Sequence, residues 1–110
     1  MIEIKNIYNT DKINLVNEYF EDIIKQKGFR LERIISYGHV TPNEYWYDQD
    51  EDEFVLLLKG NAKLQFEDGN VIELSEGDYI IIPKHVKHRV IYTNTQTNTF
   101  WLTCYYKNEL

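Results

Sequence analysis

The sequence has little cysteine, proline or glycine and no long hydrophobic run. Cys104 is the one cysteine among 110 residues, so no internal disulfide can form and a reducing cytoplasm is the expected location. No apolar stretch approaches the roughly 18 residues that a membrane-spanning helix requires. The first ten residues lack the basic and apolar regions of a secretory signal. We therefore expect a cytoplasmic protein without a membrane partner.

A basic surface stripe is also missing. The formal net charge is −6, and the densest basic stretch, KHVKHR, is short. Binding to a phosphate backbone requires clustered lysine and arginine that release counterions, so nucleic acid is excluded as an expected partner. No repeat or linker-like tract divides the chain, and we expect a single domain over residues 1–110.

One segment near the N-terminus has the period of an amphipathic helix. Between Asp11 and Lys27 the apolar residues are spaced by three and four, which places them on one helical face. These residues are Ile13, Val16, Phe20, Ile23 and Ile24. Thr10 or Asp11 suits the N-cap, and Gly28 suits the left-handed position after the last turn. The pattern predicts one α-helix over about 11–27, packed on the outside of a larger unit.

The remainder of the chain, about 29–106, has the texture of an all-β domain. Short segments rich in Val, Ile, Leu, Tyr and Phe alternate with turn signals: GFRLERIISYG, EFVLLLKG, AKLQFEDGN, VIELSEGD, YIIIP, HRVIYTN and TFWLTCYY. Asp68-Gly69 predicts a tight hairpin with a type I′ turn, which needs positive φ at both central residues. Seven or so short strands at even spacing predict an antiparallel sandwich or small barrel.

Two spacings in this β region resemble the motifs of the cupin family. EFVLLLKG matches the second half of the first motif, G-x5-HxH-x3,4-E-x6-G, through Glu53 and Gly60. GDYIIIPKHVKHRVIY matches G-x5-P-x-G-x2-H-x3-N through Gly77, Pro83 and His88. The likeness covers about residues 34–106 and extends to small stand-alone bacterial cupins of the RmlC-like kind. It implies a jelly-roll β-barrel, also called a double-stranded β-helix, that pairs as a homodimer.

The resemblance also implies a metal site, which this sequence matches only in part. In the family, the HxH pair, the glutamate and the second-motif histidine bind one divalent ion. Glu53 and His88 match two of these ligands, whereas the HxH positions hold Tyr47 and Gln49. His85 replaces the glycine of the second motif, and Tyr92 replaces its asparagine. The implied ligands of a Zn, Mn, Fe or Ni ion are therefore Gln49, Glu53 and His88, with His85 as a replacement for a lost one.

Strand parity gives the acidic stretch YDQDEDEF two faces. Tyr47, Gln49 and Glu53 have odd numbers and point to one side of an extended chain, whereas the aspartates at 48, 50 and 52 point to the other. A simpler interpretation of Glu53 and His88 is a hydrogen-bonded pair in a polar lumen. Aromatic side chains either fill the core or form the wall of a ligand pocket. The candidates for this wall are Trp46, Tyr47, Tyr92, Trp101 and Tyr105.

Several functions agree with these residues. The first is binding of a small molecule in the barrel lumen without catalysis. The second is a metal-dependent dioxygenase, isomerase or decarboxylase for a small organic acid or sugar derivative, with Glu53 as base and His88 as ligand. The third is metal-free acid/base catalysis by Glu53 and His88, and a purely structural role is the fourth. Because one barrel supports many chemistries, the fold does not choose between them.

Overall fold

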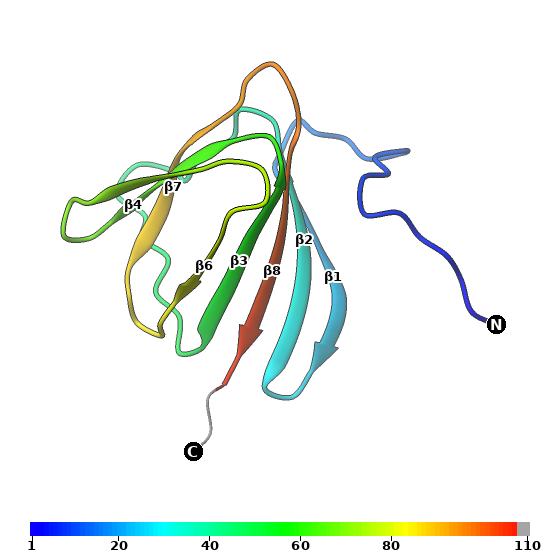
Figure 1. Ribbon diagram of the computed structural model, residues 1–110, viewed down its shortest axis with the longest axis horizontal. Coiled ribbons are helices and arrows are strands. Elements are labelled where there is room, and N and C mark those ends of the chain that lie inside the picture. The colour runs from blue at the N-terminus through cyan, green and yellow to red at the C-terminus, as the bar shows by residue number, and fades with distance from the viewer. Residues whose placement is uncertain (108–110) are drawn as a thin grey trace.

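The computed structural model describes residues 1–107 and shows two antiparallel β-sheets that face each other (Figure 1). Over these residues the chain forms eight strands and no helix. The strands are β1 (Tyr19–Gln26), β2 (Phe29–Ser36), β3 (Asp52–Lys59), β4 (Ala62–Phe66), β5 (Val71–Leu74), β6 (Tyr79–Ile82), β7 (His88–Thr93) and β8 (Thr99–Tyr106). The larger sheet has the order β1-β2-β8-β3-β6, and the smaller one has the order β5-β4-β7. The seven strands predicted after residue 29 are confirmed, as is the all-β architecture.

The predicted helix over 11–27 is wrong. Its second half forms β1, which pairs with β2 along its whole length and places Phe20 opposite Ile34. Its first half is irregular because the Asn14 side chain accepts a hydrogen bond from the Val16 amide at 2.9 Å, a local turn that competes with helical bonding. Gly28 does adopt a left-handed φ of 75°, but it lies in the turn between β1 and β2. Pairing with β2 outweighed the helical period of the apolar residues.

The core lies between the two sheets because side chains alternate along each strand. In β3, Glu53, Val55 and Leu57 are buried, whereas their neighbours are only partly buried. Seven buried residues from both sheets form the main cluster: Val55, Leu57, Ala62, Leu64, Leu74, Ile82 and Trp101. The β4–β5 hairpin is present at Asp68-Gly69, but only Gly69 has a positive φ, 94°, so the turn is not of type I′.

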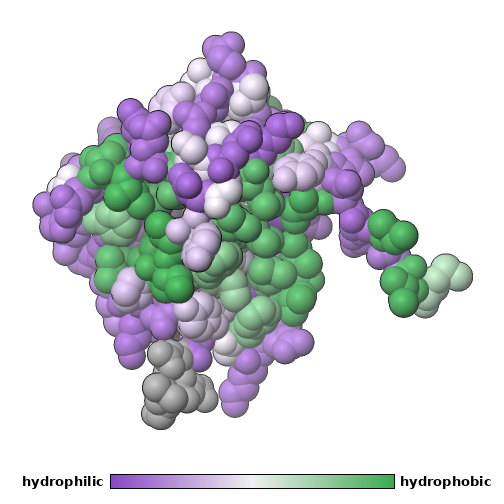
Figure 2. All heavy atoms as spheres, in the orientation of Figure 1, coloured by the Kyte–Doolittle hydropathy of each residue, from purple (hydrophilic) through white to green (hydrophobic). Residues whose placement is uncertain are grey.

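The opposite face of the larger sheet is apolar and partly open. Phe54 of β3 lies opposite Ile81 of β6, and the next pair on this face is Leu56 with Tyr79. Tyr79 and Ile81 keep 64% and 58% of their surface exposed. In Figure 2, hydrophobic residues gather in the middle of one face, where Figure 1 draws β3, β8 and β2. We refer to the side chains of Phe54, Leu56, Tyr79 and Ile81 as the outer apolar face.

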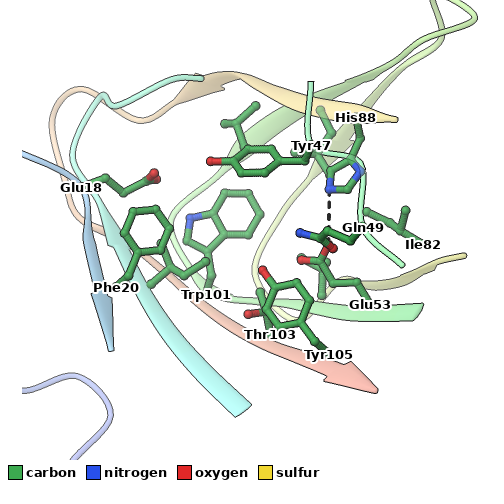
Figure 3. Close-up of a pocket in the computed structure, with 14 residues that line it drawn as sticks. Glu18, Phe20, Tyr47, Gln49, Glu53, Ile82, His88, Trp101, Thr103 and Tyr105 are labelled. Carbon is green, nitrogen blue, oxygen red and sulfur yellow. Dashed lines mark ion pairs between the residues drawn. The ribbon is translucent and has the colours of Figure 1, made fainter. Parts of the chain in front are cut away.

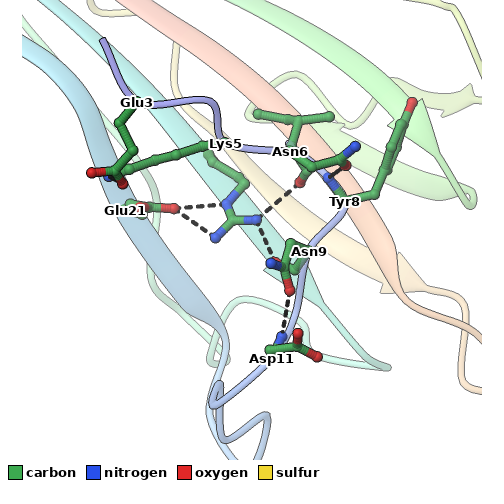
Figure 4. A network of polar contacts seen from close by, with 9 residues as sticks. Glu3, Lys5, Asn6, Tyr8, Asn9, Asp11 and Glu21 are labelled. Atoms are coloured by element: carbon green, nitrogen blue, oxygen red, sulfur yellow. Dashed lines mark hydrogen bonds and ion pairs between the residues drawn. The ribbon is translucent and has the colours of Figure 1, made fainter. Parts of the chain in front are cut away.

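Arg33 holds the N-terminal segment against the β1–β2 pair. Its guanidinium contacts the Glu21 carboxylate at 2.7 Å and donates to the carbonyls of Ile7 and Asn9 at 2.9 and 2.7 Å. Figure 4 shows this segment passing beside Glu21 of β1. Tyr8 adds an edge-to-face contact with Phe100, with ring centroids 5.2 Å apart. Within the part of the chain that is described, no helix has the length and hydropathy needed to cross a membrane.

Candidate functional site

A small cavity opens between the two sheets, and Figure 3 shows the side chains that line it. Its volume is about 60 Å³, well below the several hundred Å³ of a site for a drug-sized ligand. Four aromatic residues line it: Phe20, Tyr47, Trp101 and Tyr105. Its polar residues are Glu18, Gln49, Glu53, His88 and Thr103. Aliphatic residues complete the wall: Ile34, Val55, Leu64, Ile82 and Val90.

Glu53 and His88 form an ion pair at one end of this cavity. Glu53 starts the buried part of β3 and His88 starts β7, and they keep only 5% and 7% of their surface exposed. His88 Nε2 lies 3.3 Å from Glu53 Oε1. The contact does not meet the geometry of a hydrogen bond, so Glu53 Oε1 is buried without a hydrogen-bond partner.

The other ring nitrogen of His88 determines what Nε2 can do. Nδ1 lies 3.0 Å from the Val86 carbonyl oxygen, an acceptor, so Nδ1 carries a proton and donates it. In neutral His88 the Nε2 lone pair therefore faces the Glu53 carboxylate. Burial by itself lowers the pKa of His88, but Glu53 and the Val86 carbonyl outweigh it and raise that pKa above its ordinary value. A proton or another positive charge between the two side chains is favoured.

Tyr47 and Gln49 bring the acidic loop to this pair. The Tyr47 backbone exchanges two hydrogen bonds with the His88 backbone, at 2.8 and 3.1 Å, and the two rings stack with centroids 5.7 Å apart. The Gln49 side chain lines the cavity, and its backbone carbonyl accepts from the His85 amide at 2.7 Å. Burial, with a smaller effect of Glu18, raises the pKa of Tyr47, which keeps the phenol neutral. Tyr47 therefore orients His88 rather than supplying a phenolate.

A second carboxylate, Glu18, lies at the other end of the cavity and was missed by sequence reasoning. It accepts a short hydrogen bond from Ser36 Oγ, which in turn accepts from Trp101 Nε1 at 3.2 Å. Burial raises the pKa of Glu18, and the Ser36 hydrogen bond partly opposes this effect. Figure 3 shows Glu18 and Phe20 on the side opposite Glu53, with Trp101 and Tyr47 between. Neither residue belongs to a motif, and both lay inside the predicted helix.

Three predicted site residues lie outside the cavity. His85 is exposed and contacts Asp48 Oδ1 through Nδ1 at 2.9 Å, so it does not join Glu53 and His88. Trp46 packs under the Arg89 guanidinium, 4.4 Å from the ring centroid. Tyr92 lies near the Lys63 ammonium group, at 5.7 Å. Trp101 and Tyr105, by contrast, do line the cavity.

The acidic stretch separates by face in the way strand parity predicts. Asp48 contacts His85 at 2.9 Å and Asp50 contacts Lys107 at 3.3 Å, both at exposed positions. Asp52 Oδ1 accepts a hydrogen bond from the Lys84 amide at 2.9 Å. These aspartates hold the loops next to the cavity and do not line it.

The donors at the Glu53–His88 end fit part of a divalent-metal site. Two ligand atoms about 2.1 Å from one tetrahedral ion are about 3.4 Å apart, close to the 3.3 Å between His88 Nε2 and Glu53 Oε1. The orphaned Glu53 oxygen and the Nε2 lone pair are strong donors, whereas the Gln49 amide is a weak one. Over residues 1–107, no group of three His, Cys, Asp or Glu residues is placed to hold a metal ion. The site can hold an ion only if water or ligand supplies further donors.

Comparisons with known proteins agree with this architecture. The family described as "Cupin domain" matches residues 33–105. The chain is 28% identical over 88 residues to acireductone dioxygenase of Bacillus cytotoxicus, covering 69% of this chain and 52% of that protein. It is 26% identical to the enzyme of the same name from Bacillus pumilus, over 50% of that protein. The chain thus spans about half the length of the curated relatives it matches.

Solved structures also agree with this architecture, over most of the chain. A crystal structure from Ralstonia eutropha JMP134, named "putative mannose-6-phosphate isomerase", superimposes with a TM-score of 0.90 and 30% identity, covering 97% of this chain and 100% of that one. A cupin superfamily protein of Desulfitobacterium hafniense superimposes with a TM-score of 0.73 over 86% of this chain and 82% of its own. Its identity is 14%, so this second likeness concerns the fold alone.

Proposed function

The chain belongs to the cupin family, and from that premise we propose that it binds a small molecule in the cavity between its sheets, against the Glu53–His88 pair. The observation that carries the proposal is the buried Glu53 Oε1, which has no hydrogen-bond partner. His88 can neutralise this carboxylate, but a buried oxygen that makes no hydrogen bond still costs about 1–3 kcal/mol. A ligand that donates a hydrogen bond or brings a positive charge recovers this energy.

The surrounding side chains support selective binding of a small ligand. Tyr105 and Trp101 supply apolar ring surface, and burial is the main reason that the pKa of the Tyr105 hydroxyl is raised. This hydroxyl therefore stays protonated, and it donates a hydrogen bond to Glu32 Oε1 at 3.4 Å. Thr103, 2% exposed, also lines the wall, and its hydroxyl donates to the same Glu32 oxygen at 3.4 Å. A mainly apolar cavity with a few directed polar groups is typical of ligand sites.

A thermal-shift screen of small polar compounds tests this proposal. A ligand present at 100 times its dissociation constant stabilises the protein by about 2.7 kcal/mol, which corresponds to a rise in Tm of roughly 10 °C for a domain of this size. The shift should largely disappear in Glu53→Gln and in His88→Gln. Glu73→Gln, an exposed change of the same kind on β5, is the matched control and should respond like the unmodified protein. Equal shifts in all four proteins would refute binding at this pair.

A second candidate is a metal-dependent enzyme, favoured by the facing lone pairs of Glu53 and His88. A divalent ion there would act as a Lewis acid on an oxygen of the bound ligand. Glu53 and His88 would hold the ion, and Gln49 would fill a weak position. Elemental analysis and calorimetric titration with Mn²⁺, Ni²⁺ and Zn²⁺ test this reading independently of activity. One ion per chain that is lost in both Glu53→Gln and His88→Gln supports it, and no uptake after reconstitution refutes it.

A further inference from the structure

Carboxylates lie at both ends of the cavity, and the basic side chain in its described wall is the His88 imidazole. Glu18 lies at one end and Glu53 at the other, and among residues 1–107 no lysine or arginine lines the space between them. The basic group nearest to Glu53 is His88, which at most neutralises that carboxylate. Glu18 contacts a neutral hydroxyl, Ser36, and in the described part of the chain the positive charge that lowers its pKa comes from His39, outside the wall. A bound organic acid would meet a surplus of negative charge.

The rings of the wall add a second attraction for cations. Tyr47 and Trp101 lie between the two carboxylates, and Phe20 lies beside Glu18, as Figure 3 shows. Aromatic faces attract ammonium groups through their quadrupole, most strongly when water is excluded. Carboxylates at the ends and rings between them are the chemistry that recognises an alkylammonium ion.

A partly satisfied buried group supports a ligand in this cavity. Glu53 keeps 5% of its surface exposed, and its Oε1 is buried without a hydrogen-bond partner while it faces the cavity. By contrast, the Glu18 carboxylate is anchored by Ser36, which is fully buried and also bonded to Trp101. One carboxylate is therefore fixed by a hydrogen bond, and the other has an oxygen that faces His88 without a hydrogen bond.

From this arrangement we propose that the ligand is a small organic cation, such as a methylated or primary amine, held between Glu18 and Glu53 and against the ring of Trp101. The proposal rests on small-molecule binding in the same cavity and specifies its chemical class. The cavity volume of about 60 Å³ limits the ligand to a few non-hydrogen atoms. A cationic ligand differs from the small organic acid or sugar derivative that the sequence suggested for a metal-dependent enzyme.

Fluorescence of Trp101 can test the inference directly. The chain has two tryptophans, and Trp46→Phe leaves Trp101 as the reporter inside the cavity. The protein, freed of metals with a chelator, is titrated with tetramethylammonium chloride and methylammonium chloride, with sodium chloride matched for ionic strength. Sodium acetate serves as the anionic probe and tert-butanol as the neutral one. We expect a saturable change with at least one of the two ammonium ions and none with acetate or tert-butanol.

Charge-removing variants then assign the contact. Glu18→Gln keeps the acceptor for Ser36 but removes the charge, and should weaken ammonium binding about tenfold or more. Glu73→Gln removes the same charge at an exposed position and should leave the binding constant unchanged. Phe20→Leu, which keeps the charge and removes a ring, should weaken binding by a smaller factor, and the unfolding curve of each variant verifies that it is folded.

The outcomes separate this inference from the proposed function. Saturation with acetate or tert-butanol but with neither ammonium ion would overturn the cationic class and leave small-molecule binding in place. Saturation with no probe would overturn the cationic class as well, and the thermal-shift screen would then decide whether another ligand binds. Ammonium binding that Glu18→Gln leaves unchanged would also refute the arrangement proposed here.

Discussion

Replacing Gly60 with alanine should be among the most damaging single changes in the β region. Gly60 follows β3 with a φ of 97°, a conformation that residues with a side chain rarely adopt. A Cβ added there would lie 2.5 Å from Thr99 Oγ1 and 2.8 Å from Thr99 Cα. Thr99 is fully buried at the start of β8, so neither atom can move aside.

Two costs add at this position. The left-handed backbone costs an alanine about 1–2 kcal/mol, and overpacking against Thr99 costs about 1–3 kcal/mol more. The sum, about 2–5 kcal/mol, is a large part of the roughly 5–15 kcal/mol that stabilises a domain. Gly69 provides the matched control, because its φ is 94° and a Cβ there meets nothing within 4 Å. Gly69→Ala should therefore show the backbone cost alone.

Urea unfolding of the two variants, followed by tryptophan fluorescence, measures the difference. Gly60→Ala should have the lower midpoint, with a gap of about 1–3 kcal/mol in unfolding free energy after multiplication by the common slope. Equal losses in both variants would show that Thr99 adds nothing and that positive φ explains the whole effect. A smaller loss in Gly60→Ala than in Gly69→Ala would refute the packing argument.

Three further predictions concern stability and assembly. Burial raises the pKa of Glu18 in the folded state above its ordinary value of 4.5. The folded protein is therefore most stable, with respect to this group, when Glu18 is protonated at low pH, and it loses that stability as pH rises through the folded pKa. Glu18→Gln should thus be more stable than the unmodified protein at pH 7 and equal to it below about pH 4, in urea unfolding at both pH values; a constant gap would contradict this. His85 has a φ of 62°, so His85→Gly should raise the unfolding free energy by about 0.5–1 kcal/mol, whereas a loss would mean that the exposed contact with Asp48 outweighs the strain. We also propose that two copies pair through the outer apolar face; Ile81→Lys should shift the mass seen by light scattering from dimer to monomer, and a monomeric unmodified protein would refute the pairing.

Local sequence signals predicted the β region because its strands and turns are encoded by adjacent residues. Short segments rich in Val, Ile, Leu, Tyr and Phe, bounded by turn signals, identified the strands from Phe29 onward, and the spacing from Glu53 to Gly60 identified the first motif. Strand parity then predicted which side chains of YDQDEDEF face inward. These features need only the strand period and the residues at the turns, which a single sequence displays.

The N-terminal wall could not be predicted in the same way. The period of residues 11–27 suits a helix. Residues 19–26 form a strand because they pair with β2, a tertiary contact that the local sequence does not display. The asparagine at position 14 was the available local signal, since its side chain competes with helical hydrogen bonds. Glu18 is held at the site by a hydrogen bond from Ser36, and no spacing rule connects these two residues. His85 does not belong to the site, because its side chain points outward and contacts Asp48.

The position of Glu18 and Phe20 has a consequence for how such proteins diversify. Both lie before residue 33, where the match to the family begins, yet they close one end of the cavity. Exchange of this single strand could change which ligand is accepted while both motifs, and the barrel they build, stay intact. Two relatives with identical motifs can then differ in specificity, and a fragment cut to the matched residues would present an open, altered pocket.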